Sequence, residues 1–540
     1  MMGNLVAVDF APLAVLLPIL GAALAFVLRR HPRAQRIVTI GTLCLTLVLE
    51  SWMLVSAWQH GAQAVMIGGW APPFGISLVV DEFSALMLVV STAVSLTVLL
   101  YATGQGMADG DEDGPISVFH PAYLILVAGV SNAFLAGDLF NLYVGFEILL
   151  TASYVLLTLG GTTARIRAGV TYVVVSVVSS VLFLVAIGMI YAATGTVNMA
   201  DLSGKLADVD PGTQMVLHVM LLVAFGVKAA VFPLSFWLPD SYPTAPAPVT
   251  AVFAGLLTKV GVYAMIRTET LLFPGERLHT ALMVVALLTM VVGILGALAQ
   301  ADFKRMLSFT LTSHIGYMVF GLATGSIAAL AATIYYVAHH IIVQTSLFLV
   351  AGLMERRGGT TNVDRLGSLA KLSPVLAVLF FVPAMNLGGI PPFSGFLGKL
   401  GLLRGGVDLG TPLAWVLLAG ALATSLLTLL AVARVWNRAF WRRAEDAEDP
   451  DPLLLIAADG GGHATTYQHV HDVPASRFSG RGDTALLPRT MVYSTGALVL
   501  LGVALTVFAG PLFDLADQAA QQMVERTPYI EAVLGAGGGS

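Results

Sequence analysis

Several titratable side chains of this sequence lie inside long apolar segments. Lys228 lies in LHVMLLVAFGVKAAVFPLSF and Lys259 lies in PVTAVFAGLLTKVGVYAMI. Burying a charged side chain at the centre of a bilayer costs about 2.5–3.5 kcal/mol on insertion scales, so such residues usually face a wet or paired interior and mark ion or proton routes. The other titratable residues in apolar segments are Glu147, His339, His340 and Lys399. This set predicts a proton or ion path across a membrane.

The composition is that of a membrane protein. The chain has 540 residues, of which 57% are hydrophobic and 11% are charged, whereas soluble domains carry about 25% charged residues. The mean hydropathy of +0.84 agrees with this interpretation. We therefore expect an all-α polytopic membrane protein. The one cysteine, Cys44, offers no disulfide and no metal site, and its apolar surroundings predict a small core residue.

The apolar runs predict about fourteen transmembrane helices, since a span needs about 17–25 residues. Their centres lie near Leu17, Leu47, Val90, Val127, Leu149, Leu182, Leu222, Ala254, Leu287, Val319, Ile342, Ala384, Ala421 and Val503. The first run is followed, not preceded, by a cluster of arginines, which predicts a span with its N-terminus outside and not a cleaved signal peptide. Later loops alternate in Lys and Arg content, so we expect both termini outside.

A polar stretch of about 441–489 separates the last span from the others. Its composition predicts a flexible cytoplasmic loop. Metal binding by the histidines of this stretch is the alternative, although an HxH pair in a loose loop is weak evidence. These histidines are His463, His469 and His471. The final GAGGGS resembles a linker and is left out of the fold prediction.

Two spans contain helix breakers. Span seven runs into Pro233, and span twelve contains NLGGIPPFSGFLGK with Pro391 and Pro392. Proline removes a helical hydrogen bond, and interrupted helices at matching places in two halves point to a transporter with inverted repeats. The breaks are five spans apart, which predicts two inverted five-helix repeats with broken helices seven and twelve. The predicted units are helices 1–3 (1–118), a first repeat (119–270), a second repeat (278–440), a cytoplasmic loop (441–489) and helix 14 with the tail (490–540).

Glu147 and Lys228 could form a proton switch. While they are paired, both groups are favoured in their charged forms; when the pair opens, the lysine can lose its proton. A static ion pair that locks two helices is the alternative, although buried pairs are poor stabilisers. Lys259 lies too deep in span eight to snorkel easily to an interface. A lysine path is therefore our first hypothesis.

His339 and His340 point about 100° apart on a helix, so they do not share one narrow face. We expect one to face the proton route and the other to face a packing neighbour or a second branch, while a structural role remains the alternative for each. Lys399 is predicted to be a terminal proton donor to the outside, or else an anchor at a helix end. The possible port or supporting residues are Asp138, His218, His314 and Gln344. Asp138 could equally be a helix cap.

Several titratable residues lie outside the predicted repeats. They are Glu50, Asp81 and Glu82, and we expect structural roles or contacts with another subunit. The sequence contains no cluster of ligands with zinc-site spacing, no phosphate-binding loop and no nucleophile elbow. We therefore predict no cofactor, no metal, no nucleic-acid partner and no soluble catalytic site.

Four segments resemble one known family. They are LFNLYVGFEILLTASYVLLTLGG, KAAVFPLSFWLPDSYPTAPAPVTAVFAGLLTKVGVYAMIR, SHIGYM and GGIPPFSGFLGK. They are similar to the antiporter-like subunits of respiratory complex I and of Mrp-type multisubunit cation/proton antiporters, over about residues 139–402. The resemblance implies fourteen helices with two inverted five-helix repeats. It also implies a relay through Glu147, Lys228, Lys259, His339 or His340, and Lys399.

One position departs from the family pattern. Many relatives have a lysine after the histidines of span eleven, whereas this chain has Gln344 in HHIIVQTS. An amide can form hydrogen bonds or hold water, but it does not carry a proton. The chain also ends about 27 residues after the last predicted span, so we expect no long lateral helix of the kind found in some relatives.

The resemblance implies a proton-translocating subunit of a bacterial cytoplasmic-membrane Na+/H+ antiporter complex. Its expected partners are a large A-type subunit, several small membrane subunits and lipids, with protons and Na+ as transported ions. One alternative is a pumping subunit of complex I or of a membrane-bound hydrogenase, driven by redox chemistry elsewhere. The other alternative is a non-conducting assembly scaffold.

Overall fold

The computed structural model describes residues 7–106, 118–275, 277–450, 454–455 and 487–535. The histidines His463, His469 and His471, and with them the possible metal site, lie outside the described residues. So does most of the predicted loop at 441–489.

Within the described residues, twelve helices are long and apolar enough to cross a membrane, and two shorter apolar helices bring the total to the fourteen predicted. The first-half spans are α1 (Ala11–Val27), α2 (Pro32–His60), α3 (Glu82–Gln105), α4 (Phe119–Leu135), α5 (Leu139–Thr158), α6 (Thr163–Thr194), α8 (Pro211–Ala229) and α10 with α11 (Ala247–Val252, Thr258–Leu271). The later spans are α12 (His279–Leu298), α13 (Phe303–Thr324), α14 (Ile327–Gly358), α16 with α17 (Pro374–Gly388, Ser394–Leu409), α18 (Pro412–Val435) and α20 (Arg489–Val507).

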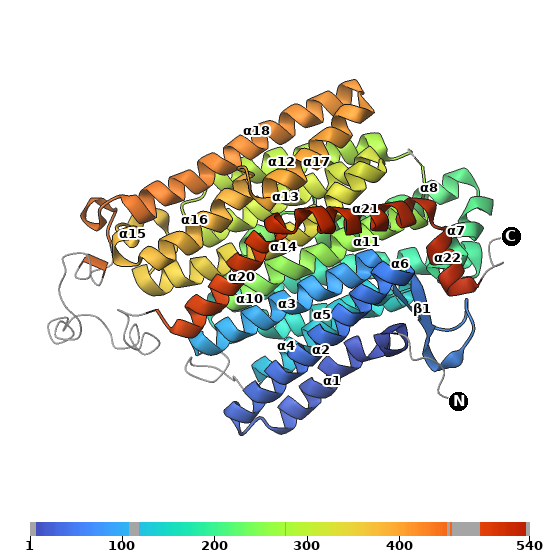
Figure 1. The fold of residues 1–540 in the computed structure, drawn as a ribbon, viewed down its shortest axis with the longest axis horizontal. Coiled ribbons are helices and arrows are strands. Elements are labelled where there is room, and N and C mark those ends of the chain that lie inside the picture. Colours follow the sequence, from blue (N-terminus) through green and yellow to red (C-terminus); the bar gives the residue numbers. More distant parts are fainter. Residues whose placement is uncertain (1–6, 107–117, 276, 451–453, 456–486, 536–540) are drawn as a thin grey trace.

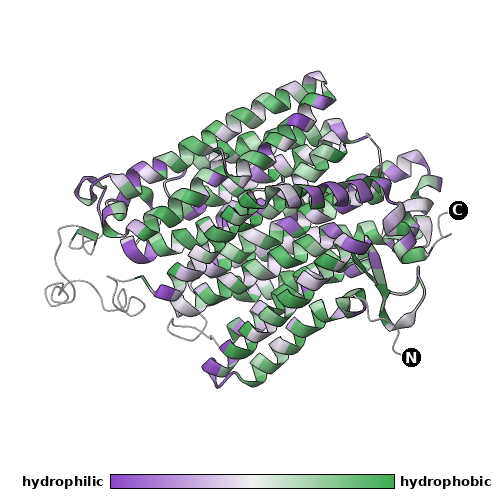
Figure 2. Ribbon diagram, in the orientation of Figure 1, coloured by the Kyte–Doolittle hydropathy of each residue, from purple (hydrophilic) through white to green (hydrophobic). Residues whose placement is uncertain are grey.

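The spans lie side by side along the long axis of the molecule (Figure 1). Both ends of the described part of the chain lie at one end of the molecule, beside the hairpin of β1 (Gln63–Met66) and β2 (Ser77–Val80) and the short helices α7 (Met199–Lys205) and α22 (Thr527–Leu534). At the opposite end lies α15 (Leu369–Leu372). Hydrophobic residues cover most of the length of the spans (Figure 2). The helices therefore cross the membrane along this axis.

The most apolar windows of α10–α11 and of α14 are completely buried, whereas only 33% of the corresponding windows of α1 and α2 are. The central helices therefore need no lipid contact and can carry polar groups against one another. Cys44 is exposed on α2. Its prediction as a core residue was wrong, because an apolar run in a membrane protein can be apolar towards lipid as well as towards the core.

Helices α4 and α5 repeat the contacts of α12 and α13. A methyl group on Gly129 would lie 2.5 Å from the backbone nitrogen of Leu149, and one on Gly293 would lie 2.5 Å from that of Ser313. Glycine lets the two backbones approach this closely, as in many membrane helix pairs. Both members of the second pair follow those of the first by 164 residues.

The same 164-residue offset relates two isolated β-bridges. One joins Asp138 to Asn198 and the other joins Asp302 to Asn362. The first bridge adjoins α7, at the end of the molecule with both termini, and the second lies near α15 at the opposite end (Figure 1). Equivalent local structures thus face opposite ends, which is the geometry expected of inverted repeats.

The predicted breaks in spans seven and twelve have the same local structure. Ala230 follows α8 and Gly389 follows α16, and both adopt the left-handed conformation. The N–H group of the next residue then donates a hydrogen bond to the carbonyl five positions earlier. Val231 N–H donates to Gly226 O at 2.9 Å, and Ile390 N–H donates to Met385 O at 3.2 Å. Pro233, Pro391 and Pro392 follow within these turns. The prediction of broken helices seven and twelve is confirmed.

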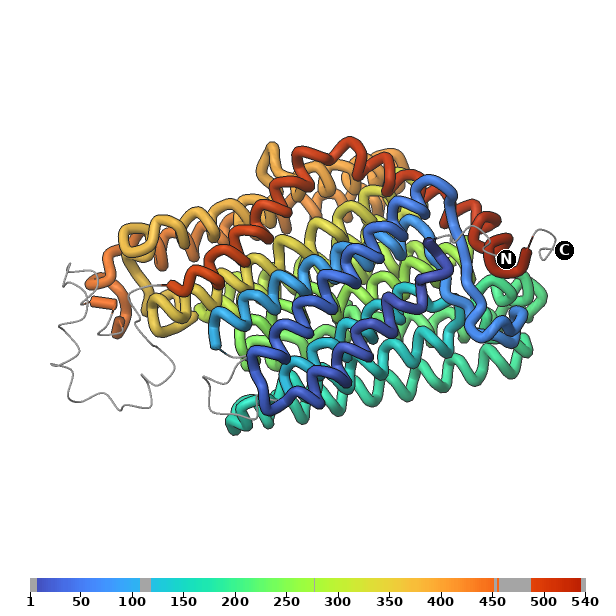
Figure 3. Tube along the Cα trace, turned by 60° about the horizontal axis from the view of Figure 1, so that its bottom comes forward, coloured from blue at the N-terminus to red at the C-terminus, as the bar shows by residue number. Residues whose placement is uncertain are grey.

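Two further interruptions were not predicted. Span eight contains a π-helical segment, Phe253–Leu257, between α10 and α11. Span fourteen bends at Phe508, after which α21 (Ala509–Glu525) continues towards the end of the molecule that carries the termini. Figure 3 shows α20 and α21 crossing the bundle as one bent rod. The π-helical segment lies next to a polar residue of the core, as described below.

We predict that Gly129→Ala and Gly293→Ala each destabilise the protein by about 1–3 kcal/mol, because the added methyl forces two packed backbones apart. The measurement is the thermal unfolding midpoint of the purified protein in detergent. Gly188→Ala is the matched control, since a methyl there meets nothing within 4 Å. Unchanged midpoints for the first two variants would show that these close approaches do not hold the helix pairs together.

Candidate functional site

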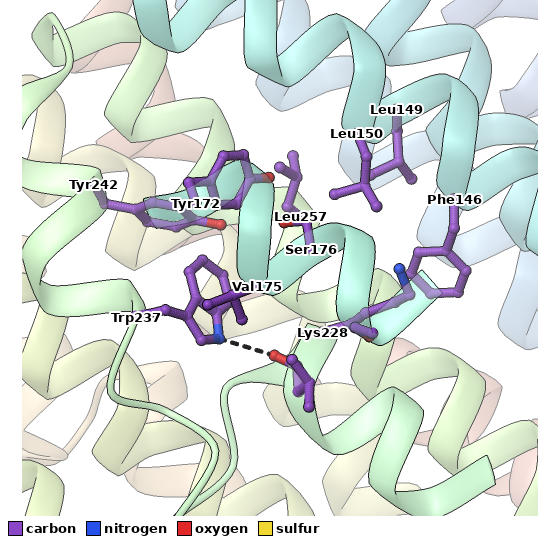
Figure 4. Close-up of a pocket in the computed structure, with 12 residues that line it drawn as sticks. Phe146, Leu149, Leu150, Tyr172, Val175, Ser176, Lys228, Trp237, Tyr242 and Leu257 are labelled. Atoms are coloured by element: carbon purple, nitrogen blue, oxygen red, sulfur yellow. Dashed lines mark hydrogen bonds between the residues drawn. The ribbon is translucent and has the colours of Figure 1, made fainter. Parts of the chain in front are cut away.

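Lys228 lies in the last turn of α8, directly before the break, and is 8% exposed. Its Nζ donates to Ser180 Oγ at 3.1 Å, and the Ser180 hydroxyl donates to Glu147 Oε1 in a short hydrogen bond. The ammonium also lies 4.8 Å from the centre of the Phe146 ring (Figure 4). Helices α5, α6 and α8 therefore bring Glu147 and Lys228 together through one serine.

Glu147 and Lys228, both described in this structure, do not form the direct ion pair that we expected but are joined through Ser180. Ser180 lies between them and can pass a proton or break the connection by rotating its hydroxyl. This serine was not predicted as a functional residue, because a hydroxyl in a helix commonly bonds to its own backbone.

A cavity of about 20 Å³ adjoins Lys228 and is lined by Phe146, Tyr172, Ser176 and Trp237, among others (Figure 4). This volume holds about one water molecule. Trp237 Nε1 donates to Val227 O at 3.0 Å, so it satisfies a carbonyl next to the lysine at the end of α8. The lysine therefore has a small, mainly apolar cavity beside it, in which Ser176 and Ser179 supply hydroxyl groups.

Lys259 is fully buried, and its Nζ donates to Ala254 O at 2.7 Å. Ala254 belongs to the π-helical segment, and π-bulges frequently occur at functional sites. In addition, Gly261 packs closely on the backbone of Ala229, the residue after Lys228. The helices of the two lysines are thus in contact, and the distorted segment of span eight supplies the acceptor for its own lysine.

His339 and His340 of α14 point to different neighbours. His339 Nδ1 lies 3.0 Å from Ser394 Oγ at the start of α17. The His340 ring lies 5.1 Å from the ring of His314 on α13, and His314 Nδ1 in turn lies 2.6 Å from Tyr336 Oη. The two histidines therefore face spans twelve and ten, as their angular separation on a helix requires.

Several polar atoms of this cluster have no partner among the described residues. They are His314 Nε2, His339 Nε2, both ring nitrogens of His340, and Gln344 Oε1. Buried polar atoms nearly always have hydrogen-bond partners, so this concentration indicates a place for ordered water. Gln344 Nε2 donates to Leu307 O at 2.7 Å, which leaves its oxygen as an acceptor.

Lys399 of α17 reaches back to the end of α16. Its Nζ donates to Leu387 O at 3.0 Å, to Gly388 O at 3.3 Å and to Ser425 Oγ at 3.0 Å, and it lies 5.0 Å from the Tyr317 ring centre. The last carbonyls of a helix lack internal partners and carry a partial negative charge. The break in span twelve thus creates the binding place of this lysine.

The remaining candidates lie away from the lysines. Asp138 caps α5 by accepting from Asn141 N–H at 2.6 Å, and its Oδ2 has no partner among the described residues. His218 forms a short hydrogen bond with Glu269 of α11. Asp81 pairs with Arg267 at 2.6 Å. Glu82 accepts a hydrogen bond from Gln522 Nε2, and Glu50 accepts one from the Ser131 hydroxyl. In the described part of the chain, neither carboxylate bonds to a lysine of the expected relay.

Comparison with known proteins identifies the family of the chain. The family model described as "NADH:quinone oxidoreductase/Mrp antiporter, TM" matches residues 136–428. The D subunit of a Na(+)/H(+) antiporter of Alkalihalophilus pseudofirmus is 38% identical over 526 residues, which are 97% of this chain and 98% of the relative.

Two solved structures are similar over most of the chain. A chain of the Mrp complex from a Dietzia species has a TM-score of 0.85 and 32% identity, with 98% of this chain and 99% of that chain covered. A chain of respiratory complex I from Thermus thermophilus has a TM-score of 0.73 and 25% identity, with coverages of 95% and 99%. The chain therefore belongs to the NADH:quinone oxidoreductase/Mrp antiporter transmembrane family.

Proposed function

We propose that this chain is the proton-translocating, D-type component of a bacterial Mrp-type Na+/H+ antiporter complex. The observation that carries the proposal is that three buried lysines each donate to an oxygen atom inside the bundle. Lys259 and Lys399 donate to carbonyls of interrupted spans, whereas Lys228, beside the break after α8, donates to Ser180 of α6. The D-type relative and the Mrp complex support this assignment over a complex I subunit. The chain is thus a transporter subunit, not an enzyme that makes or breaks covalent bonds.

The proposed path begins at Glu147 and Lys228. A proton that reaches Ser180 can exchange between the carboxylate and the amine, because the hydroxyl donates to one group and accepts from the other. Loss of the lysine proton leaves a neutral amine, which no longer stabilises the glutamate as an anion. The serine thus makes the charges of the two groups interdependent.

The path continues through Lys259 towards α14. Water bound at the unpartnered nitrogens of His340 and His314 would carry the proton past Gln344, whose amide can orient water but cannot titrate. His339 then connects through Ser394 to the break in span twelve, where Lys399 is bound. Neutral and charged lysines alternate along such a route, so the charge of one subunit can influence ion movement in a neighbour.

We further propose the orientation and the neighbours. The chain would lie in the bacterial cytoplasmic membrane with both termini outside, and a large A-type subunit and several small membrane subunits would surround it. Residues 119–270 and 278–440 would form the two inverted repeats, between the N-terminal helices (1–118) and the loop (441–489) with helix fourteen (490–540). Protons would pass through this chain, and Na+ movement would be coupled to them within the complex.

Lys228→Ala is predicted to lower sodium-induced collapse of a preset proton gradient by at least about tenfold, as expected when a positioned proton-transfer group is lost. The measurement uses inverted vesicles with the whole gene cluster in a host stripped of its own antiporters, and the rate is divided by the amount of assembled complex. Lys205→Ala, at an exposed lysine paired with Asp201, is the control.

Normal antiport by an assembled Lys228→Ala complex would support the scaffold alternative. If sodium has no effect even with the unchanged chain, the redox-driven alternative replaces the antiporter proposal. The unchanged complex distinguishes the two alternatives: it responds to sodium if the chain is a scaffold, and it does not respond if the complex is driven by redox chemistry.

Ser180→Ala is predicted to reduce the antiport rate by at least about tenfold while the complex still assembles, because it removes the group that connects Glu147 to Lys228. Thr171→Ala is the matched control, since this hydroxyl lies on the exposed face of the same helix. Equal rates for Ser180→Ala and Thr171→Ala would exclude a role for the serine in proton transfer.

The proposed orientation predicts which end of the molecule reacts with a membrane-impermeant maleimide on intact cells. In a Cys44→Ala chain, Asp208→Cys at the end with the termini should be labelled at once. Arg443→Cys at the opposite end should be labelled only after permeabilisation. Asp208 lies in the short helical turn after α7, and Arg443 lies 72% exposed after the end of α18. The reverse labelling pattern would place the termini in the cytoplasm.

A further inference from the structure

A buried acid–base pair lies outside the relay described above. His218 Nε2 and Glu269 Oε1 form a short hydrogen bond, and their side chains are only 7% and 6% exposed. The His218 ring stacks on Phe273 with the ring centres 4.2 Å apart and the planes 7° from parallel. The imidazole is therefore held on one face by a phenyl ring and at one nitrogen by a carboxylate.

A cavity of about 310 Å³ adjoins this pair at the end of the molecule where the termini lie. It has room for several water molecules. Besides His218 and Phe273, its lining includes Gln214, Arg277 and Arg526. Among the described residues, the bond to Glu269 is the one hydrogen bond of the imidazole. Nδ1 is thus left for water in the cavity.

The pair and the lysines are placed on the same two helices. His218 precedes Lys228 by ten residues on α8, and Glu269 follows Lys259 by ten residues on α11. Ten residues of α-helix span about 15 Å. The two helices run in opposite directions and are in contact at Gly261 and Ala229. The His218–Glu269 pair therefore lies about 15 Å from the lysines along both helices, towards the end that carries the cavity.

The charges around the pair favour a proton over a metal cation. The charged groups that line the cavity are Arg277, from the segment after α11, and Arg526, between α21 and α22. Arg277 is oriented by Gln214, since its Nη1 donates to Gln214 Oε1 at 2.8 Å. Guanidinium groups have no acceptor atoms with which to bind Na+, whereas a proton can pass through hydrogen-bonded water without a cation site. Glu269 is the carboxylate that bonds to the imidazole.

We propose that His218 and Glu269 form a proton port that exchanges protons between this cavity and the Lys228–Lys259 region. A proton from cavity water binds Nδ1 and makes an imidazolium–carboxylate pair. Transfer of the Nε2 proton to Glu269 Oε1 then gives a neutral imidazole and a carboxylic acid. The acid releases its proton to water on the side of the lysines, and rotation of the imidazole ring, which turns Nδ1–H towards the carboxylate and the free nitrogen towards the cavity, prepares the pair for the next proton. The proposal rests on the proposed antiporter function.

The test is chemical rescue in the vesicle assay with the complete complex. His218→Ala should lower the sodium-induced rate per assembled complex by at least about tenfold, and added imidazole should restore most of the loss, because the enlarged cavity admits it. Glu269→Gln keeps the shape but cannot accept the proton, so it should be slow and should not respond to imidazole. His279→Ala, at the start of α12 and outside the cavity lining, is the control.

A normal rate for assembled His218→Ala, or a loss that imidazole does not restore, would overturn the port and leave a structural pair. If Glu269→Gln were as fast as the unchanged chain, the carboxylate would have no part in transfer and the proposal would also fail. If sodium does not collapse the proton gradient even with the unchanged complex, the antiporter function itself is refuted. The unchanged chain therefore separates failure of the port from failure of the function on which it rests.

Discussion

A charged amine in the membrane interior needs polar atoms around it, and this requirement organises the core of the protein. Lys399 is bound by carbonyls at the broken end of α16, and Lys259 is bound by a carbonyl of a π-helical segment. Lys228 lies beside the break after α8 and is bound by Ser180. An unbroken helix satisfies its own carbonyls, so interruptions provide acceptors that lipid and apolar side chains lack. The helix interruptions therefore supply carbonyl acceptors for Lys259 and Lys399.

The inverted repeat explains why such breaks occur twice. The bridges Asp138–Asn198 and Asp302–Asn362 show the same backbone arrangement at opposite ends of the molecule. The lysines, however, are not at equivalent places: Lys228 precedes its break, whereas Lys399 follows the break and reaches back. The two halves thus share a scaffold but place their amines differently. The polar cluster of α14 belongs to the second half, where His339 bonds to Ser394 at the start of α17.

Much of the fold was predictable from the sequence, because each span has a long apolar run and the two main breaks contain proline. The π-helical segment at Phe253–Leu257 was not predicted, since no proline or charge interrupts its apolar pattern. Ser180, and the pairing of the candidate His218 with Glu269, were also not predicted from the sequence. The first is one of several serines on α6, and the second joins residues 51 positions apart. Such contacts depend on tertiary packing, which apolar periodicity does not determine.

The most direct test of the proposed relay is a double-mutant cycle of Glu147→Gln and Lys228→Gln, read out as the antiport rate per assembled complex. If the two groups act as one unit through Ser180, the double variant should be about as slow as the slower single variant, because the second change removes a connection that is already lost. If the two losses instead multiply, Glu147 and Lys228 act independently. In that case the connection through Ser180 would be a packing contact and not a step in proton transfer.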